Sequence, residues 1–195
     1  METRLARNAR KISFSPKHLS LILGTLLGDG YLDRTTRGYS LRIHHGIQQK
    51  EYVDFKYEIL KSFVNSAPKQ SGKAYYFRTV SHPSLNYLRE IFYLERTKVL
   101  PKEFLEEYLD PFALAIWVMD DGAADWKQLR INTQSFSLAE NIWLTQLLQA
   151  KFGIFSKINK DRGKYRLRVS AQSMQPLKDL ILPHIIPSML YKLSP

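Results

Sequence analysis

The stretch "LILGTLLGDGYL" (21–32) combines an apolar helix signal with a carboxylate at the helix end. Ser15 is a favourable N-cap, Pro16 fits the first turn, and the apolar run continues to Leu27 before two glycines favour a stop. Asp29 stands between those glycines. A helix C-terminus carries partial negative charge, so the electrostatics there favour Lys or Arg over Asp. The position of Asp29 therefore indicates a nearby cation.

The same pattern occurs a second time in "DPFALAIWVMDDG" (110–122), where Asp121 follows Asp29 by 92 residues. "LRIHH" at 41 matches "LRINT" at 129, an offset of 88, and "TKVLP" at 97 resembles "YKLSP" at 191, an offset of 94. Changes in loop length produce such small variations in the period of a repeat. We therefore predict two similar halves, 1–109 with a basic N-terminal arm and 110–195, packed as in a two-fold dimer.

The composition indicates a folded protein with a polyanionic partner. The chain has 195 residues, 44% of them hydrophobic, a net charge of +11 and no cysteine. Such a charge favours nucleic acid, with an inert basic surface as the alternative. The lack of cysteine excludes disulfides, thiolate metal sites and a cysteine nucleophile.

Localisation signals are weak. No apolar run approaches the roughly 18 to 20 residues of a membrane span, and "METRLARNARK" lacks the apolar core of a secretory signal, so we expect an intracellular, non-secreted protein. Its basic residues suit a transit peptide or, as we favour, a flexible arm on nucleic acid. Whether the compartment is an organelle or a bacterial or phage cytoplasm stays open.

Hydrophobic periodicity predicts strands and helices in the same order in both halves. Residues 66–72 are expected to form a loop. Alternating patterns predict strands over 39–46, 73–81, 129–137, 155–160 and 164–171. Helical patterns cover 15–27, 49–64, 83–93, 110–122, 138–152 and 176–186.

If the two motif helices pack side by side, Asp29 and Asp121 meet at one point. Gly24 and Gly28 would permit a close approach on one side, with the bulkier Ile116 and Asp120 aligned to them. Two adjacent carboxylates repel unless a divalent cation lies between them. Oxygen ligands without cysteine or clustered histidine favour Mg²⁺ or Mn²⁺, and such a site in a basic protein suggests phosphodiester chemistry. The alternative is that each Asp-Gly only forms a turn.

These residues resemble a known family. "ILGTLLGDG" (22–30) and "LAIWVMDDG" (114–122) are similar to the two motifs of single-chain LAGLIDADG homing endonucleases, and the second has the Trp-x-Met-Asp-Asp-Gly form of an intron-encoded subgroup. "INTQSFS" (131–137) and "IIPSMLYKLSP" (185–195) resemble that subgroup as well. The resemblance implies an α/β (α+β) fold of two αββαββα halves, each with an antiparallel sheet, joined through the motif helices. The sheets would lie along the DNA major groove.

The resemblance also implies cleavage of both DNA strands at a long asymmetric site with divalent metal ions. By position, Asp29 and Asp121 would hold the metal, with Gly28 and Asp120 directly before them as further metal-site candidates. Asp120 falls where the family more often has a small residue, and it could instead bind water or cap the helix. Lys98 and Lys192 would be catalytic lysines near the scissile phosphates, unless they are ordinary surface charges.

Strand alternation places polar residues on one sheet face, where Arg suits guanine, Asn and Gln suit adenine, and lysines suit phosphates. The histidines show no metal spacing, and His44 and His45 should point to opposite faces. An ordinary solvated sheet face is the alternative for any single residue. The candidate DNA-binding residues are Arg42, His44, Lys73, Tyr75, Arg78, Arg130, Asn132, Gln134, Lys157, Lys160, Arg162, Arg166 and Arg168.

Three functions remain at this point. The first is a metal-dependent DNA endonuclease that works as a monomer on double-stranded DNA. The second is an RNA maturase, with intron RNA as partner, or a DNA-binding regulator of the same fold that does not cut. The third is a basic structural protein in which each Asp-Gly only terminates a helix.

Overall fold

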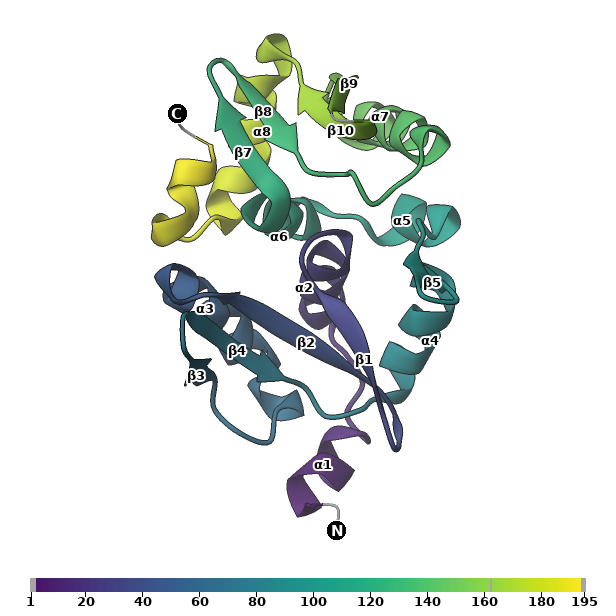
Figure 1. The fold of residues 1–195 in the computed structure, drawn as a ribbon, viewed down its shortest axis with the longest axis vertical. Coiled ribbons are helices and arrows are strands. Elements are labelled where there is room, and N and C mark those ends of the chain that lie inside the picture. The colour runs from purple at the N-terminus through teal and green to yellow at the C-terminus, as the bar shows by residue number, and fades with distance from the viewer. Residues whose placement is uncertain (1–2, 162, 194–195) are drawn as a thin grey trace.

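Two halves stack on each other through a central pair of helices in the computed structural model, which describes residues 3–161 and 163–193 (Figure 1). The pair consists of α2 (Pro16–Leu27) and α6 (Pro111–Asp121). Both begin as the sequence predicts: the side chains of Ser15 and Asp110 accept backbone N–H groups of the first turn, and a proline follows each cap. Nearly all of both helices is buried, so they form the centre of the core.

The N-terminal half has a four-stranded antiparallel sheet in the order β1-β2-β4-β3. Its helices α3 and α4 pack against β2, and α3 also contacts β4. Besides α2, the elements are α1 (Arg4–Ala9), β1 (Tyr31–Thr35), β2 (Gly38–Gly46), α3 (Lys50–Leu60), β3 (Lys69–Ser71), β4 (Ala74–Arg78), α4 (Pro83–Phe92), the short ribbon β5 (Tyr93–Leu94) and β6 (Thr97–Lys98), and α5 (Lys102–Tyr108).

The C-terminal half repeats this arrangement in the strand order β7-β8-β10-β9, again antiparallel. Helix α7 packs on β9 and β10. Besides α6, the elements are β7 (Gly122–Asp125), β8 (Gln128–Ile131), α7 (Leu138–Phe152), β9 (Ser156–Asp161), β10 (Lys164–Val169), α8 (Met174–Ile181) and a terminal 3₁₀ helix, η5 (Pro187–Lys192). The predicted mixed α/β fold of two duplicated halves is confirmed. The division at residues 109/110, just before α6, stays a prediction.

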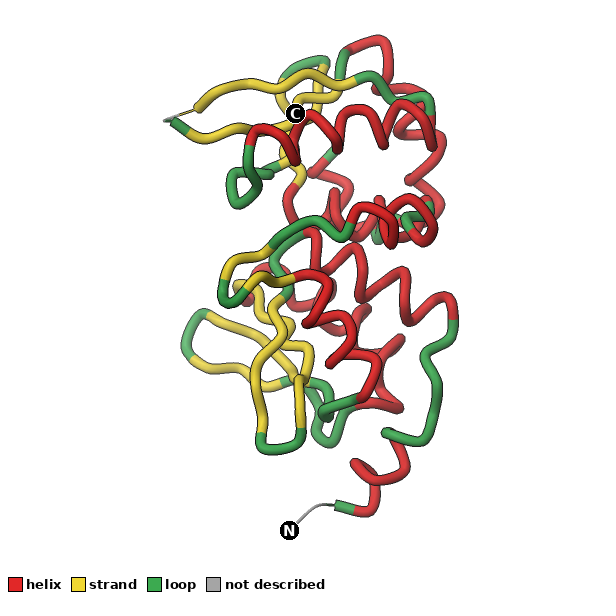
Figure 2. The backbone as a smooth tube through the Cα atoms, turned by 90° about the vertical axis from the view of Figure 1, so that its right-hand side faces the viewer, coloured by secondary structure: helices red, strands yellow, loops and turns green. Residues whose placement is uncertain are grey.

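The strands of both halves lie on one side of the molecule and the helices on the other (Figure 2). Alternation along β2 shows which residues face which side: Leu41 and Ile43 are buried, whereas Arg42 and His44 are exposed. Each sheet therefore has one face packed on helices and one open polar face. No helix in the described ranges is long and apolar enough to span a bilayer.

Several local expectations are wrong. The N-terminal arm is not extended and free: it forms α1, whose Ala6 and Ala9 are buried and whose cap residue Thr3 donates a hydrogen bond to Asn65. The predicted loop 66–72 contains β3, and β1 was not predicted as a strand.

The strand predicted over 129–137 ends at Ile131. Two residues later the Thr133 side chain turns inward, where its hydroxyl donates to the Asn141 side chain at 2.5 Å and accepts the backbone N–H of Leu167 at 3.2 Å. This buried contact draws the chain off the sheet toward α7.

Candidate active site

The two motif helices approach so closely that only glycine fits on one side. A Cβ added to Gly24 would lie 2.3 Å from the carbonyl oxygen of Ala113 and 2.6 Å from the Ile116 Cβ. A Cβ added to Gly28 would lie 2.5 Å from the Cβ of Asp120. The alignment of these glycines with Ile116 and Asp120 follows from the internal repeat. This contact fixes the two helix ends, and the residues after them, relative to each other.

Asp29 and Asp121 sit at the same end of the helix pair, Asp29 just past α2 and Asp121 as the last residue of α6. Burial raises the pKa of both carboxyls, and the nearby Asp120 charge adds to this. For Asp121, burial together with Asp29 and Asp120 raises the pKa to about 8. Burial and neighbouring carboxylates therefore disfavour the charged form of both side chains, at two helix C-termini that are themselves negative, and the nearby lysines offset this only in part.

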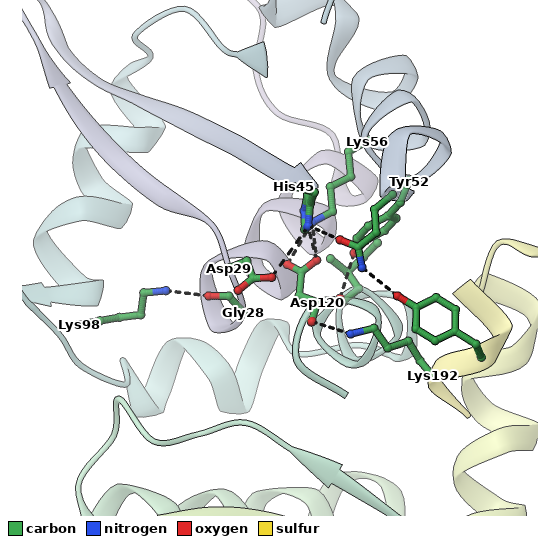
Figure 3. Close-up of polar contacts among 11 residues, drawn as sticks. Gly28, Asp29, His45, Tyr52, Lys56, Lys98, Asp120 and Lys192 are labelled. Atoms are coloured by element: carbon green, nitrogen blue, oxygen red, sulfur yellow. Dashed lines mark hydrogen bonds and ion pairs between the residues drawn. The ribbon is translucent and has the colours of Figure 1, made fainter. Parts of the chain in front are cut away.

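Two lysines bind equivalent backbone oxygens beside these aspartates (Figure 3). The Lys98 ammonium, at the end of β6, donates to the carbonyl of Gly28 at 3.0 Å and to that of Gly30 at 3.1 Å. The Lys192 ammonium, on η5, donates to the carbonyl of Asp120 at 3.0 Å. Gly28 and Asp120 each directly precede a motif aspartate. The repeat in the sequence thus becomes a repeat of cation and carbonyl in the structure.

The side chain of Asp120 is held by a lysine from the other half. Lys56, on α3, lies 2.7 Å from one carboxylate oxygen of Asp120 and 3.0 Å from the other, and neither side chain is exposed (Figure 3). Sequence reasoning did not single out Lys56. The sequence indicates Lys56 only by its place on the apolar stripe of α3, between Val53 and Leu60, because a charge at such a position requires a buried partner.

His45 lies between Asp29 and Asp120 and was also missed as part of the site. Its Nδ1 is 2.9 Å from the side-chain oxygen of Gln49 and 3.9 Å from Asp29 Oδ2, and its Nε2 is 3.8 Å from Asp120 Oδ1. Burial lowers the pKa of His45 to about 4, so the ring is neutral at physiological pH. One ligand atom from each of Asp29, His45 and Asp120 lies within 4.8 Å of the others.

The available donors fit a hard divalent cation. Asp29 and Asp121 supply carboxylates in need of compensating charge, and the carbonyls of Gly28 and Asp120 supply neutral oxygen beside them. Carboxylate and carbonyl oxygens suit Mg²⁺ and Mn²⁺. The Asp120 carboxylate is already neutralised by Lys56, so its backbone oxygen is the better donor.

In the N-terminal half, the open sheet face carries some of the candidate DNA-binding residues. Arg42 and His44 are exposed on β2, and Arg78 is exposed on β4 directly opposite Arg42. Lys73 is exposed in the turn before β4. The placement of Tyr75 on this face is wrong: it lies on the helix side with Phe77, and its hydroxyl donates to Asp54 of α3.

The alternation along β4 instead puts Tyr76 on the open face, opposite His44 and with the two ring centroids 5.9 Å apart. Sequence reasoning missed Tyr76, although counting back by two from Arg78 would have found it.

In the C-terminal half, Arg130, Arg166 and Arg168 share the open face opposite buried Leu129 and Leu167. Lys157 and Lys160 are exposed on the edge strand β9, where Lys157 pairs with Arg168 on the open face and Lys160 pairs with Tyr165 on the opposite face. Asn132 and Gln134 lie beyond the end of β8 rather than on it, so strand alternation does not fix their direction. Arg162 lies outside the described residues.

Comparison with known proteins gives consistent matches. Residues 19–177 match the model of the LAGLIDADG DNA endonuclease family. The cytochrome b mRNA maturase bI2 of Saccharomyces cerevisiae is 34% identical over 90% of this chain, which spans about half (47%) of that relative. The DNA endonuclease I-ChuI of Chlamydomonas applanata is 29% identical over 94% of this chain and 97% of its own length.

Among solved structures, the homing endonuclease I-WcaI bound to its DNA recognition sequence superposes with a TM-score of 0.89. The match covers 98% of this chain and 93% of that one at 24% sequence identity, so it supports the fold. The duplicated motifs, the duplicated sheets and the family match agree. This chain belongs to the LAGLIDADG DNA endonuclease family.

Proposed function

We propose that this chain is a site-specific endonuclease that hydrolyses both strands of DNA with divalent metal ions. The observation that carries the proposal is the duplicated set of motif aspartate, preceding carbonyl and lysine, repeated where the halves meet. An approximate two-fold relation between the halves suits the two antiparallel strands of a duplex, one phosphodiester for each set. The sheets of both halves lie on the same side of the molecule (Figure 2), and the arginines on their open faces would supply the binding surface.

Asp29 and Asp121, with the carbonyls of Gly28 and Asp120, would hold the metal. A bound ion would stabilise charge on the phosphate and lower the pKa of a bound water. The lysines lie within hydrogen-bond distance of those same carbonyls, so their ammonium groups border the reaction centre. There, Lys98 and Lys192 can polarise the attacking water or stabilise the charge that develops on the phosphate oxygens.

His45 and Gln49 belong to one side of this centre. Together with Asp29, Tyr31, Arg42, His44 and Gly46 they line a polar cavity of about 330 Å³. A cavity bordered by a motif aspartate and by residues of the open sheet face is suited to a phosphate and its water. Because the His45 ring is neutral, it can accept or donate a hydrogen bond without adding charge.

An RNA maturase is the second candidate, favoured by the match to the yeast bI2 maturase. The two functions make different demands on the site: DNA cleavage requires Asp29 and Asp121 to hold a metal, whereas splicing assistance does not.

The test uses duplex DNA that carries the insertion junction of the encoding intron, incubated with Mg²⁺ and separately with Ca²⁺. We expect a staggered double-strand cut in Mg²⁺, reduced on the order of a hundredfold or more by Asp29→Asn or Asp121→Asn. Glu58→Gln, an exposed residue of α3, is the matched control and should cut normally. Tight binding in both ions with no cut in Mg²⁺ would overturn the nuclease proposal, and stimulated splicing of the intron RNA would then favour the maturase.

A further inference from the structure

Each motif aspartate is followed, four residues later, by a second aspartate on the adjoining strand. The sequences are "DGYLD" (29–33) and "DGAAD" (121–125). Asp33 lies on β1 and Asp125 on β7, the equivalent strands of the two sheets. Neither belongs to the metal site, and both stand on surfaces otherwise rich in arginine. Their identical spacing from the active site calls for an explanation beyond the motif itself.

Each of these aspartates contacts two arginines through a single oxygen. Asp33 Oδ2 accepts a hydrogen bond from Arg78 Nη2 at 2.7 Å and lies 3.9 Å from Arg42 Nη1. In the other half, Asp125 Oδ2 accepts a hydrogen bond from Arg168 and lies 3.5 Å from Arg130 Nε. Each cluster therefore uses a single carboxylate oxygen and arginines from the equivalent pair of strands, β2 and β4 in one half and β8 and β10 in the other.

The strand register shows that the two arginines of each cluster occupy equivalent backbone positions in the two halves. Arg42 pairs with Arg78 across β2 and β4, and Arg130 pairs with Arg168 across β8 and β10. Directly opposed like charges destabilise a sheet. An aspartate beside each pair offsets that repulsion and holds both guanidinium groups near one oxygen.

A role in stability alone does not explain these clusters. The arginine side chains are between 33% and 51% exposed, and ion pairs at such positions contribute little to folding. An aspartate on a surface that binds DNA also repels phosphate. The aspartate compensates for this repulsion by orienting the arginines. A guanidinium that is held at one edge keeps its remaining N–H donors in a defined direction and loses less conformational entropy when it binds DNA.

We propose that Asp33 and Asp125 are specificity-determining positioning residues, each holding its arginine pair in the orientation that reads guanine. Paired N–H donors of arginine match O6 and N7 of guanine in the major groove. Because the clusters are equivalent in the two halves, the target carries guanines on either side of the cut centre, at positions related by the approximate two-fold axis. This inference rests on the proposed function, since it concerns the DNA sequence that the same protein cleaves.

The test is selection of bound duplexes from a randomised DNA library, followed by sequencing. It compares the wild-type chain with Asp33→Asn, Asp125→Asn and the control Glu58→Gln. We expect Asp33→Asn to lower the guanine preference at least about fivefold on one side of the centre only, and Asp125→Asn to do so on the other side only. Affinity for non-specific DNA should stay equal or rise, because a negative charge is removed. A purely structural role would weaken binding without this one-sided change.

A second pair of variants tests whether misfolding causes the change in base preference. Arg78→Lys and Arg168→Lys keep the charge but lose the bidentate donor edge, and each should lose the same guanine as the aspartate variant of its own half. Unchanged base preference in all four variants, or equal changes on both sides, would overturn the inference while leaving the nuclease proposal intact. A wild-type chain that enriches no sequence and cuts no junction DNA would overturn both.

Discussion

Lys56 and Asp120 link the two halves through an ion pair that no solvent reaches. Removing one partner of a buried pair leaves an uncompensated charge, which typically costs about 3 to 5 kcal/mol. We therefore expect Lys56→Met to lower the free energy of unfolding by about that amount in denaturant titrations. In the double variant Lys56→Met with Asp120→Asn, no charge remains buried, and most of the loss should be recovered.

The control for this pair is Lys61→Met, which removes an exposed lysine bonded to Glu58 and should change stability by less than about 0.5 kcal/mol. If Lys56→Met is no more destabilising than Lys61→Met, the pair does not hold the halves together.

Asp121 predicts a dependence of stability on pH in the metal-free protein. Its pKa rises from 3.8 in the unfolded chain to about 8 in the folded one, so the folded state favours the protonated form. The stabilisation from this group is complete below about pH 4 and is lost as pH rises toward about 8. Asp121→Asn should remove this decline, measured as the difference in unfolding free energy between the two variants across that range.

Divalent metal should reverse the effect of pH. An ion that binds only the folded protein and prefers ionised Asp121 raises the melting temperature of the wild type most at alkaline pH. Asp121→Asn should show a much smaller shift with added Mg²⁺. An equal shift in both proteins would place the metal away from Asp121.

Among the secondary-structure elements, the paired helices α2 and α6 depend on a glycine contact. An Ala in place of Gly24 would gain helix propensity, but its Cβ would meet the Ala113 carbonyl, which is backbone and cannot rotate away. We expect Gly24→Ala to destabilise the protein by about 1 to 3 kcal/mol, as overpacking does elsewhere. Lys17→Ala, an exposed substitution in the same helix, is the control, and thermal melts of the two would separate packing from propensity.

Elements with strong local signals were predictable from the sequence, and weakly patterned ones were not. Helix α7 occupies the predicted 138–152, because Ser137 and Glu140 form a capping box and Gly153 ends the helix in a left-handed conformation. Strand β1 has five residues of mixed polarity directly after a motif helix, so its alternation is hard to recognise. Strand β8 ends early because of Thr133, whose partner Asn141 is known only from the fold.

The same distinction applies to the candidate site. Asp29, Asp121, Lys98 and Lys192 stand out in the sequence because each has a counterpart at nearly the same offset in the other half. Lys56 has no such counterpart. Its partner Asp120 stands where the first motif has Gly28, and the two side chains meet only when α3 packs on α2 beside α6. A residue without a counterpart in the other half is not found by a search based on repetition.

At the scale of the whole molecule, the net charge of +11 predicts binding to DNA that weakens steeply with salt. The edge strand β9 offers a direct test, because Lys157 is exposed there and pairs in register with Arg168 on the open face, whereas Lys160 pairs with Tyr165 on the opposite face. If Lys157 contacts one phosphate, Lys157→Gln should lower the slope of log affinity against log salt by about 1, and Lys160→Gln should change it less. Base preference should not change, since phosphate contacts carry no sequence information. Lys61→Gln removes a lysine of the helix side and should leave the slope unaltered. A slope that is unchanged in Lys157→Gln would mean that the duplex does not extend over β9, and would confine the interface to the strands nearer the centre.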